Sequence, residues 1–441
     1  MSVAAFTHLR AQMRDLGPAH PVGRVIGVRR GVIEVTGLEQ TAALGDRARL
    51  HCRGREALTA EVLSLARGSV ALLPDDAADG VAIGDEVELL GPCGIAPDDS
   101  WVGRVVDPFG RALDGRPLAR GPVEHPLRAP PPEAARRKRL GTRLETGLAV
   151  FNTLLPLVRG QRIGLFAGSG VGKSSLLGSL ARGISADIVV IALIGERGRE
   201  LRDFVEQVLG PEGRARAVIV AATSDQSPLI RRRCAWAAMT VAEHFRDQGH
   251  HVLFLADSVT RFAEAHREVA LAGDEPASLR GFPPSTAHQI MALGERAGPG
   301  LEGAGDITAV FSVLVAGSDM DEPVADILRG VLDGHVVMER EIAERGRFPA
   351  INLLRSVSRS LPGAASAEEN RLISRARALL GAYDRAEMMI QAGLYAAGSD
   401  PLVDAALQVW PQLDGFIAQA EAEGIAGSFA RLAAILAQAE G

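Results

Sequence analysis

The sequence predicts an α/β protein in three consecutive parts: an N-terminal β-barrel, a core with a parallel sheet, and a C-terminal α-helical domain. Short β-branched segments recur between residues 23 and 95 at the spacing typical of small barrels. Longer, almost continuous apolar segments alternate with helical stretches between residues 148 and 315, as buried parallel strands require. From residue 366 onward the apolar residues follow helical periodicity. A chain of 441 residues also exceeds the size at which a single core stops growing.

Composition limits the classes of protein that this chain can belong to. Hydrophobic residues make up 47% and charged residues 23%, which favours packed domains over disorder. The net charge of −6 argues against nucleic acid as a partner, because phosphate binding needs clustered positive charge. Cys52, Cys93 and Cys234 are scattered, which indicates buried thiols rather than disulfides or zinc ligands. No apolar run is long enough to span a membrane and no signal peptide is recognisable, so we expect a cytoplasmic protein.

The first 22 residues are expected to form a separate N-terminal element. Apolar residues at near-helical spacing between residues 2 and 16 predict a short amphipathic helix ahead of Gly17 and Pro18. Such a helix either packs on its own domain or docks a partner. We assign it to partner docking.

Residues 23–95 are expected to form the barrel. The strands should cover residues 25–28, 32–35, 48–52, 58–65, 69–73 and 86–90. Turn residues separate these segments, and closure into a barrel would leave no exposed sheet edge.

Residues 96–363 are expected to form the core domain, which begins with a Pro-, Gly- and Arg-rich extended connector that reaches residue 140. Its basic cluster at residues 136–139 suits either a solvated linker face, which we favour, or an anion site. Core strands are expected at residues 163–166, 188–194, 217–221, 252–255 and 307–315. A long helix is expected over residues 229–245, with residues 231–233 in a solvated turn or a subunit contact.

Residues 364–441 are expected to be helical throughout. Ser366 and Glu369 have the spacing of a capping box, in which each residue's side chain accepts a hydrogen bond from the other's backbone. Residues 398–401 contain Gly and Pro and should interrupt the helices.

A phosphate-binding loop follows the first core strand. Its pattern matches G-x-x-x-x-G-K-[ST] except that Ala167 replaces the first Gly, a change that costs little where the residue only ends a strand. Inward-turned backbone N–H groups and the following helix N-terminus would bind a nucleotide polyphosphate. Lys173 would reach the β- and γ-phosphates, and the Ser174 hydroxyl would bind Mg²⁺. The expected nucleotide-binding residues of the loop are Gly168, Ser169, Gly170, Val171, Gly172, Lys173, Ser174 and Ser175.

Two further strand ends carry carboxylates suited to hydrolysing a γ-phosphate. The apolar strand at 252–255 leads to Asp257, expected to hold Mg²⁺ through water, or alternatively to cap the next helix. The strand at 188–194 leads to Glu196 and Glu200, which alternate with two arginines. Glu196 is the candidate for polarising the attacking water, and Glu200 for supporting the hydrated Mg²⁺. A purely structural ion-pair cluster is the alternative.

Four segments, residues 165–174, 194–200, 257–262 and 280–285, together resemble the type III export ATPases. This family comprises the flagellum-specific export ATPase and its injectisome relatives, in the superfamily of the rotary ATP synthase α and β subunits. The resemblance extends from the barrel to residues 398–401. It implies an N-terminal barrel, a RecA-like P-loop core, a helical C-terminal domain and a homohexameric ring that hydrolyses ATP with Mg²⁺.

The resemblance also implies roles for residues that the patterns alone do not assign. Glu196 matches the catalytic glutamate, Arg197 an arginine near the phosphates, and Arg261 an arginine beside the Walker-B carboxylate. In the segment 349–359, the last residue, Arg359, matches the arginine finger that a neighbouring subunit supplies. Phe348 lies where the family places a Tyr or another aromatic against adenine.

The function implied is that of the flagellar type III export ATPase, which releases chaperones and feeds substrates into the export gate. Implied partners are a regulator or stator bound through the N-terminal helix, export chaperones and substrates, and a central stalk protein, with peripheral association at the cytoplasmic face of the inner membrane. The injectisome ATPase is the main alternative. The rotary synthase catalytic subunit, an RNA-dependent ring helicase and a non-catalytic nucleotide-binding subunit are further alternatives.

Overall fold

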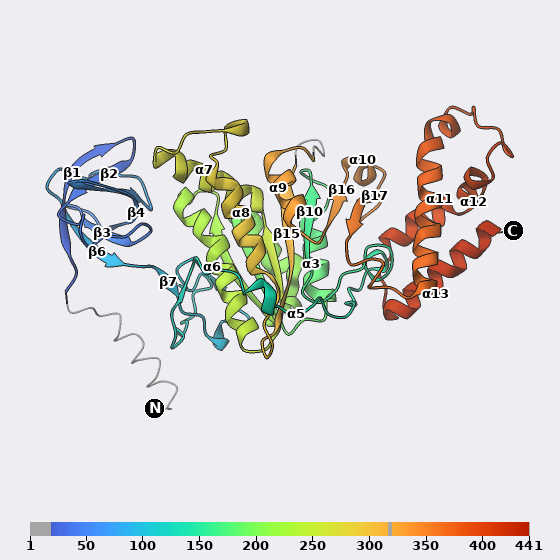
Figure 1. Ribbon diagram of the computed structural model, residues 1–441, viewed down its shortest axis with the longest axis horizontal. Coiled ribbons are helices and arrows are strands. Elements are labelled where there is room, and N and C mark those ends of the chain that lie inside the picture. Colours follow the sequence, from blue (N-terminus) through green and yellow to red (C-terminus); the bar gives the residue numbers. More distant parts are fainter. Residues whose placement is uncertain (1–18, 316–319, 441) are drawn as a thin grey trace.

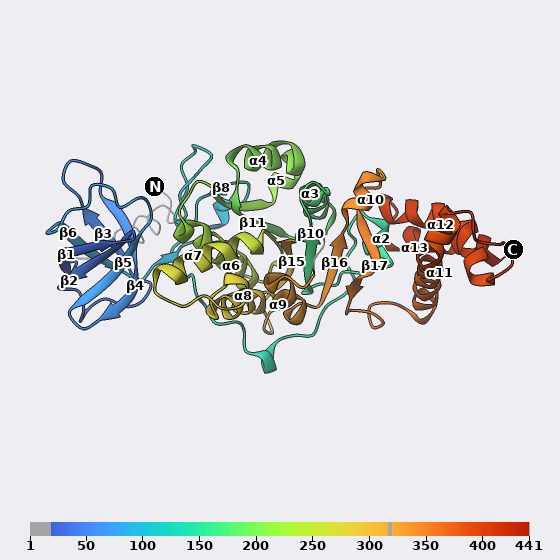
Figure 2. The ribbon, with the colours of Figure 1, turned by 90° about the horizontal axis from the view of Figure 1, so that it is seen from above.

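The computed structural model describes residues 19–315 and 320–440, so the predicted N-terminal helix lies outside the described residues. The molecule is elongated, with the barrel at one end, the sheet-containing core in the middle and the helical domain at the other end (Figures 1 and 2). This arrangement confirms the predicted fold class.

The first six strands form a closed barrel in the order β1-β2-β5-β4-β3-β6. Alternate residues of these strands face the barrel interior, where Ile33, Leu50 and Leu72 are fully buried. All six predicted strand segments are confirmed. The strands are β1 (Val22–Arg29), β2 (Val32–Thr36), β3 (Arg47–His51), β4 (Leu58–Ala66), β5 (Ser69–Pro74) and β6 (Glu86–Gly91).

The core is built on a mainly parallel sheet in the order β17-β16-β10-β15-β13-β11-β12-β8, with β14 paired to β15. The five predicted core strands are confirmed as β10 (Arg162–Ala167), β11 (Ile188–Glu196), β12 (Ala217–Thr223), β13 (His251–Asp257) and β15 (Asp306–Leu314). The prediction did not include β8 (Val105–Val106), β14 (Gly298–Pro299), β16 (Gly334–Met338) and β17 (Ile351–Ser358).

Helices cover both faces of this sheet (Figure 2). Successive residues of β10 point to opposite faces, so Leu165 and Phe166 belong to different buried clusters. The Leu165 side packs against α3 (Lys173–Gly183), and α4 (Gly198–Asp203) and α5 (Gly210–Ala215) lie on the same side. The Phe166 side packs against α6 (Pro228–Asp247), α7 (Val259–Ala272), α8 (Ser285–Arg296) and α9 (Pro323–Val331).

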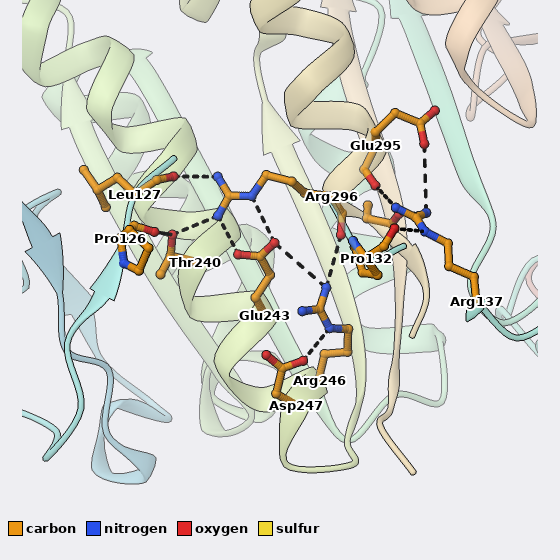
Figure 3. Close-up of polar contacts among 11 residues, drawn as sticks. Pro126, Leu127, Pro132, Arg137, Thr240, Glu243, Arg246, Asp247, Glu295 and Arg296 are labelled. Atoms are coloured by element: carbon orange, nitrogen blue, oxygen red, sulfur yellow. Dashed lines mark hydrogen bonds and ion pairs between the residues drawn. The ribbon is translucent and has the colours of Figure 1, made fainter. Parts of the chain in front are cut away.

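The segment 96–140 is more structured than the extended connector predicted from its composition. Strand β8 lies beside β12 in the core sheet, and β7 (Gly94–Ile95) pairs with β9 (His125–Pro126). Figure 3 shows how buried charge holds the segment in place: Arg296 of α8 donates to the Leu127 carbonyl at 2.6 Å and pairs with Glu243 of α6. The polar contacts come from the core helices, so a local sequence window does not reveal them.

The basic cluster at residues 136–139 only partly forms a solvated face. Arg136 and Arg139 are exposed, as predicted. Arg137 instead donates to the Ala297 carbonyl at 3.2 Å, and Lys138 Nζ lies 2.8 Å from Asp306 Oδ1.

The prediction for residues 231–233 is wrong for two of the three arginines. Arg232 and Arg233 lie within α6 and are 5% and 4% exposed. Arg232 Nη2 lies 2.8 Å from Glu61 Oε1 of the barrel, and Arg233 Nε donates to the Pro108 carbonyl at 3.2 Å. Arg232 therefore joins the core to the barrel, and Arg233 joins α6 to the segment 96–140, because a buried cation requires a nearby acceptor.

The C-terminal domain contains α11 (Ala367–Gln391), α12 (Pro401–Ala418) and α13 (Gly424–Ala437), which confirms the helical prediction. The predicted capping box of Ser366 and Glu369 is present, and Asp400, within the predicted break, caps α12. In the described ranges no helix combines the length and the apolar character that crossing a bilayer demands. The three cysteines are free thiols, with Cys52 and Cys234 buried and Cys93 partly buried.

Candidate nucleotide site

The predicted phosphate loop lies at the carboxyl end of β10, between that strand and the N-terminus of α3. The backbone adopts left-handed conformations at Gly170 (φ 80°) and Gly172 (φ 87°), which favour glycine. A Cβ at Gly172 would also lie only 3.2 Å from the ring of Phe348. The loop therefore has the strand-before, helix-after setting that an anion-binding loop needs.

Lys173, in the helix that follows β10, meets Asp257, the last residue of β13, at the carboxyl ends of two strands that flank β15. The Lys173 ammonium contacts Asp257 Oδ1, and the same oxygen accepts a hydrogen bond from Ser312 Oγ at 2.9 Å. Asp257 is 3% exposed, so its carboxylate is stabilised by these donors rather than by water. The alternative that Asp257 caps the next helix is wrong, because Ser258 is the N-cap of α7.

Glu196 ends β11 and faces the same group of charges. Burial and the nearby charge of Asp257 raise the pKa of Glu196 to about 7, against the opposing effect of Lys173. A carboxylate with a pKa near the operating pH is suited to accept a proton. The structure therefore gathers Lys173, Asp257 and Glu196 at one edge of the sheet.

Glu200 and Arg197 are placed differently from these three residues. Both are exposed, and Arg197 Nη1 lies 2.7 Å from Glu200 Oε1. This hydrogen bond is the main cause of a lowered pKa at Glu200. The ion-pair alternative thus describes Arg197 and Glu200 well, whereas Glu196 lies within the electrostatic influence of Asp257 and Lys173.

Phe348 lies over the loop, with 52% of its surface exposed. An exposed aromatic ring beside a phosphate loop offers a flat apolar surface to a nucleotide base.

Arg359 lies at the opposite edge of the sheet from the loop. Its backbone N–H donates to the Asp333 carbonyl, and Asp333 N–H donates to the carbonyl of Arg162, the first residue of β10. The guanidinium donates to the Leu332 carbonyl at 3.0 Å and the Arg329 carbonyl at 3.2 Å. The length of β10, about 16 Å at the usual rise per residue, separates Arg359 from the loop of its own chain.

The residues present fit a Mg²⁺ ion bound together with a nucleotide. Within the described ranges no group of three His, Cys, Asp or Glu side chains forms a metal cage. Mg²⁺ is usually held instead by one or two protein oxygens, phosphate oxygens and water. The buried Asp257 carboxylate already contacts a cation, the Lys173 ammonium, and Ser174 follows Lys173 in the first turn of α3.

Sequence reasoning did not identify Ser312 as part of this site. Ser312 is a fully buried hydroxyl in the predicted apolar strand β15, beside β13, whose last residue is Asp257. Ser312 and Thr308 are the two polar residues in the predicted strand 307–315, and this interruption of an apolar run was the available signal.

The family comparisons agree with this geometry. Residues 147–358 match the model of the ATP synthase alpha/beta family, nucleotide-binding domain, and residues 365–434 match the T3SS EscN ATPase C-terminal domain. The flagellum-specific ATP synthase of Caulobacter vibrioides is 45% identical over 97% of this chain and 98% of its own length. The protein of that name from Bacillus subtilis is 41% identical, with 90% of each chain covered.

A solved structure has the same fold. The assembled ATPase EscN from the enteropathogenic E. coli type III secretion system superposes with a TM-score of 0.86 and 36% identity, covering 94% of this chain and all of the other. A second structure, with a TM-score of 0.85 over 94% of this chain and 36% identity, contains EscN in complex with its central stalk EscO.

Proposed function

We propose, since this chain belongs to the type III export ATPase family within the ATP synthase α/β superfamily, that it hydrolyses ATP to energise protein export through the flagellar apparatus. The observation that carries the chemistry is the convergence of Lys173, Asp257 and Glu196 beside the phosphate loop. The flagellar assignment rests on the names of the relatives, which match this chain over nearly its whole length.

Each residue of the site has a role in this proposal. Residues 168–175 bind the phosphates through backbone N–H groups, and Lys173 neutralises charge on the β- and γ-phosphates. Ser174, Asp257 and Glu200 would hold Mg²⁺, the last two through water, and the ion would supply electrostatic stabilisation of the phosphates. Glu196 orients the attacking water and accepts its proton. Arg197, which follows Glu196 directly in the chain, would approach the γ-phosphate.

Arg359 acts in the site of a neighbouring copy. Its position at the far edge of the sheet supports this, because it is remote from the loop of its own chain. The chain carries both the water-activating Glu196 and the finger Arg359, so a ring of identical copies builds a complete site at every interface. The proposed assembly is a homohexamer, and the assembled state named for EscN supports an oligomer.

The adenine base stacks on Phe348. Phe lacks the hydroxyl of the Tyr expected from the family, but its ring offers the same flat apolar surface.

The proposed partners extend beyond the ring. The complex of EscN with EscO supports a central stalk protein as a partner of this chain. Export chaperones and substrates, and a regulator or stator bound through residues 1–22, complete the set, at the cytoplasmic face of the inner membrane. Nucleic acid is not a partner in this proposal.

An injectisome ATPase is the second candidate function. The fit to the EscN structure and the EscN C-terminal family model favours it. The higher identity of the flagellar relatives favours the main proposal.

Phosphate release from ATP by the purified protein tests the proposal. We expect Mg²⁺-dependent turnover in the wild type and almost none in Glu196→Gln, which removes the base while preserving shape. An equally active Glu196→Gln would refute the role of Glu196, and absence of turnover in the wild type would favour a non-catalytic subunit. Stimulation by RNA would favour a helicase. Deleting the gene in its host should abolish flagella; loss of a needle complex instead would identify an injectisome ATPase.

A further inference from the structure

Arg347 connects the segment that carries Phe348 to the C-terminal domain. Its guanidinium donates through Nη1 to the Pro349 carbonyl at 3.0 Å and through Nη2 to the Ile351 carbonyl at 2.8 Å. Its Nε lies 2.9 Å from Asp414 Oδ1 of α12. Only 10% of the Arg347 side chain is exposed, so the charge depends on these partners.

The position of Phe348 depends on this backbone segment rather than on packing of its own ring. Half of Phe348 is exposed, and the ring approaches the loop at Gly172. Arg347 directly precedes Phe348 in the chain. Its side chain binds the carbonyl of Pro349, the next residue after Phe348, and the carbonyl of Ile351. Fixing these atoms limits where the ring can lie.

A cavity of about 130 Å³ lies between β17 and the C-terminal helices, lined by Arg347, Asp414 and the stacked rings of Tyr383 and Trp410, among others. The Arg347 guanidinium, through two hydrogen bonds to carbonyls and one ion pair with a carboxylate, is therefore a direct polar connection between α12 and the Phe348 segment. Figure 1 shows β17 and α10 (Arg340–Glu344) beside the C-terminal helices.

We propose that Arg347 is a positioning residue for nucleotide-base binding: by tying the Phe348 segment to Asp414 of α12, it holds the ring over the phosphate loop. The inference rests on the proposed ATPase function and deepens it. It also makes the C-terminal domain part of what determines affinity for the base, because α12 supplies one of the three anchors of the guanidinium.

Enzyme kinetics with two inhibitors separates base binding from phosphate binding. In Arg347→Ala we expect the KM for ATP and the inhibition constant of ADP to rise about fivefold or more, the lower end of the loss of one base–aromatic stack. The inhibition constant of inorganic tripolyphosphate, which has no base, should stay unchanged. In Asp414→Asn the ADP constant should rise less, because both carbonyl contacts of Arg347 remain.

Two further variants sharpen the test. Arg345→Ala is the matched control, because Arg345 pairs with Glu387 of α11 at 3.3 Å, at the same junction but without contacts to the Phe348 segment. It should leave the ADP constant unchanged. Adding Arg347→Ala to Phe348→Ala should cause little further loss, since both changes remove the same stack.

The proposal fails if Arg347→Ala leaves the inhibition constant of ADP unchanged, or if the inhibition constant of tripolyphosphate rises by the same factor. It also fails if Arg345→Ala raises the ADP constant as much as Arg347→Ala does. Calorimetric binding of ADP gives the same comparison without turnover. An inactive wild type would therefore overturn the proposed function while the role of Arg347 is still decided by binding.

Discussion

His266 is held in its neutral form between three helices. Its Nε2 donates to Ser285 Oγ at 2.7 Å, and its Nδ1 faces Arg232 Nη1 at 3.5 Å as an acceptor. Ser285 in turn donates to Glu275. Burial, and then the charge of Arg232, lower the pKa of His266 to about 4. A proton on Nδ1 would place a second positive charge against the guanidinium.

This residue makes the stability of the core depend on pH. Because the pKa is lower in the folded state than in the unfolded state, the unfolded chain binds the proton more readily. The stabilisation is fully present above about pH 6.5 and is lost as the pH falls towards 4, by up to about 3 kcal/mol. We expect the wild-type melting temperature to fall more steeply between pH 7 and 4.5 than that of His266→Gln. Parallel melting curves for the two proteins would contradict this role.

The residues that cap the N-terminus of α11 also attach the helical domain to the core. Ser366 Oγ accepts a hydrogen bond from Glu369 N–H, and the Glu369 carboxylate accepts one from Ser366 N–H at 2.7 Å. The same carboxylate pairs with Arg143 of the core at 3.1 Å. Glu369 thus accepts a hydrogen bond from the backbone N–H at the helix N-terminus and also holds the helical domain against the core.

Removing the cap should loosen the first turn of α11. Ser366→Ala is expected to cost about 1 kcal/mol of stability, the usual value for an N-cap, and to speed hydrogen exchange at the amides of residues 368–370. Ser366→Asp is the control, because Asp caps equally well and its charge suits a helix N-terminus. Exchange in Ser366→Ala that matches the wild type would show that tertiary contacts alone order this turn.

At the scale of the whole molecule, Glu196 and Arg359, the two residues proposed to act together in catalysis, lie at opposite ends of the core strands. Glu196 lies at the carboxyl ends of the parallel strands, and Arg359 lies at the other end beside Arg162. In the proposed mechanism a single chain therefore carries two incomplete halves of a site. An adjacent copy in a closed ring would bring the halves together.

Mixing two inactive variants tests this arrangement. Arg359→Ala should lower turnover by roughly 10³- to 10⁵-fold while still binding nucleotide, as loss of an arginine finger does. Glu196→Ala should also be inactive. When equal amounts are mixed before assembly, about a quarter of the interfaces should combine an intact Glu196 with an intact Arg359, and activity should return.

Failure of activity to return would argue against shared sites, provided that light scattering shows mixed rings. Each variant assembled alone is the control for contaminating wild-type activity.

The strands and the phosphate loop were predictable because their signals are local. A buried parallel strand must be apolar almost throughout, and a loop that surrounds phosphate must contain glycine next to a lysine and a hydroxyl. The short strands β8 and β14 were missed because two residues carry no periodicity. Strand β16 was missed because it has only five residues, and β17, at the sheet edge, was missed because polar residues interrupt its apolar pattern.

The sequence by itself determined the order of the three parts of the fold, the strands of the barrel and the central strands, and it supplied the candidate residues for binding and cleaving a triphosphate. Only the tertiary structure decided which charges are buried together. Arg232, Arg296 and Arg347 look like surface residues in their local segments, yet each is buried against a partner distant in sequence. A charge can be buried only where the fold supplies its counter-charge, and that partner lies beyond any local pattern.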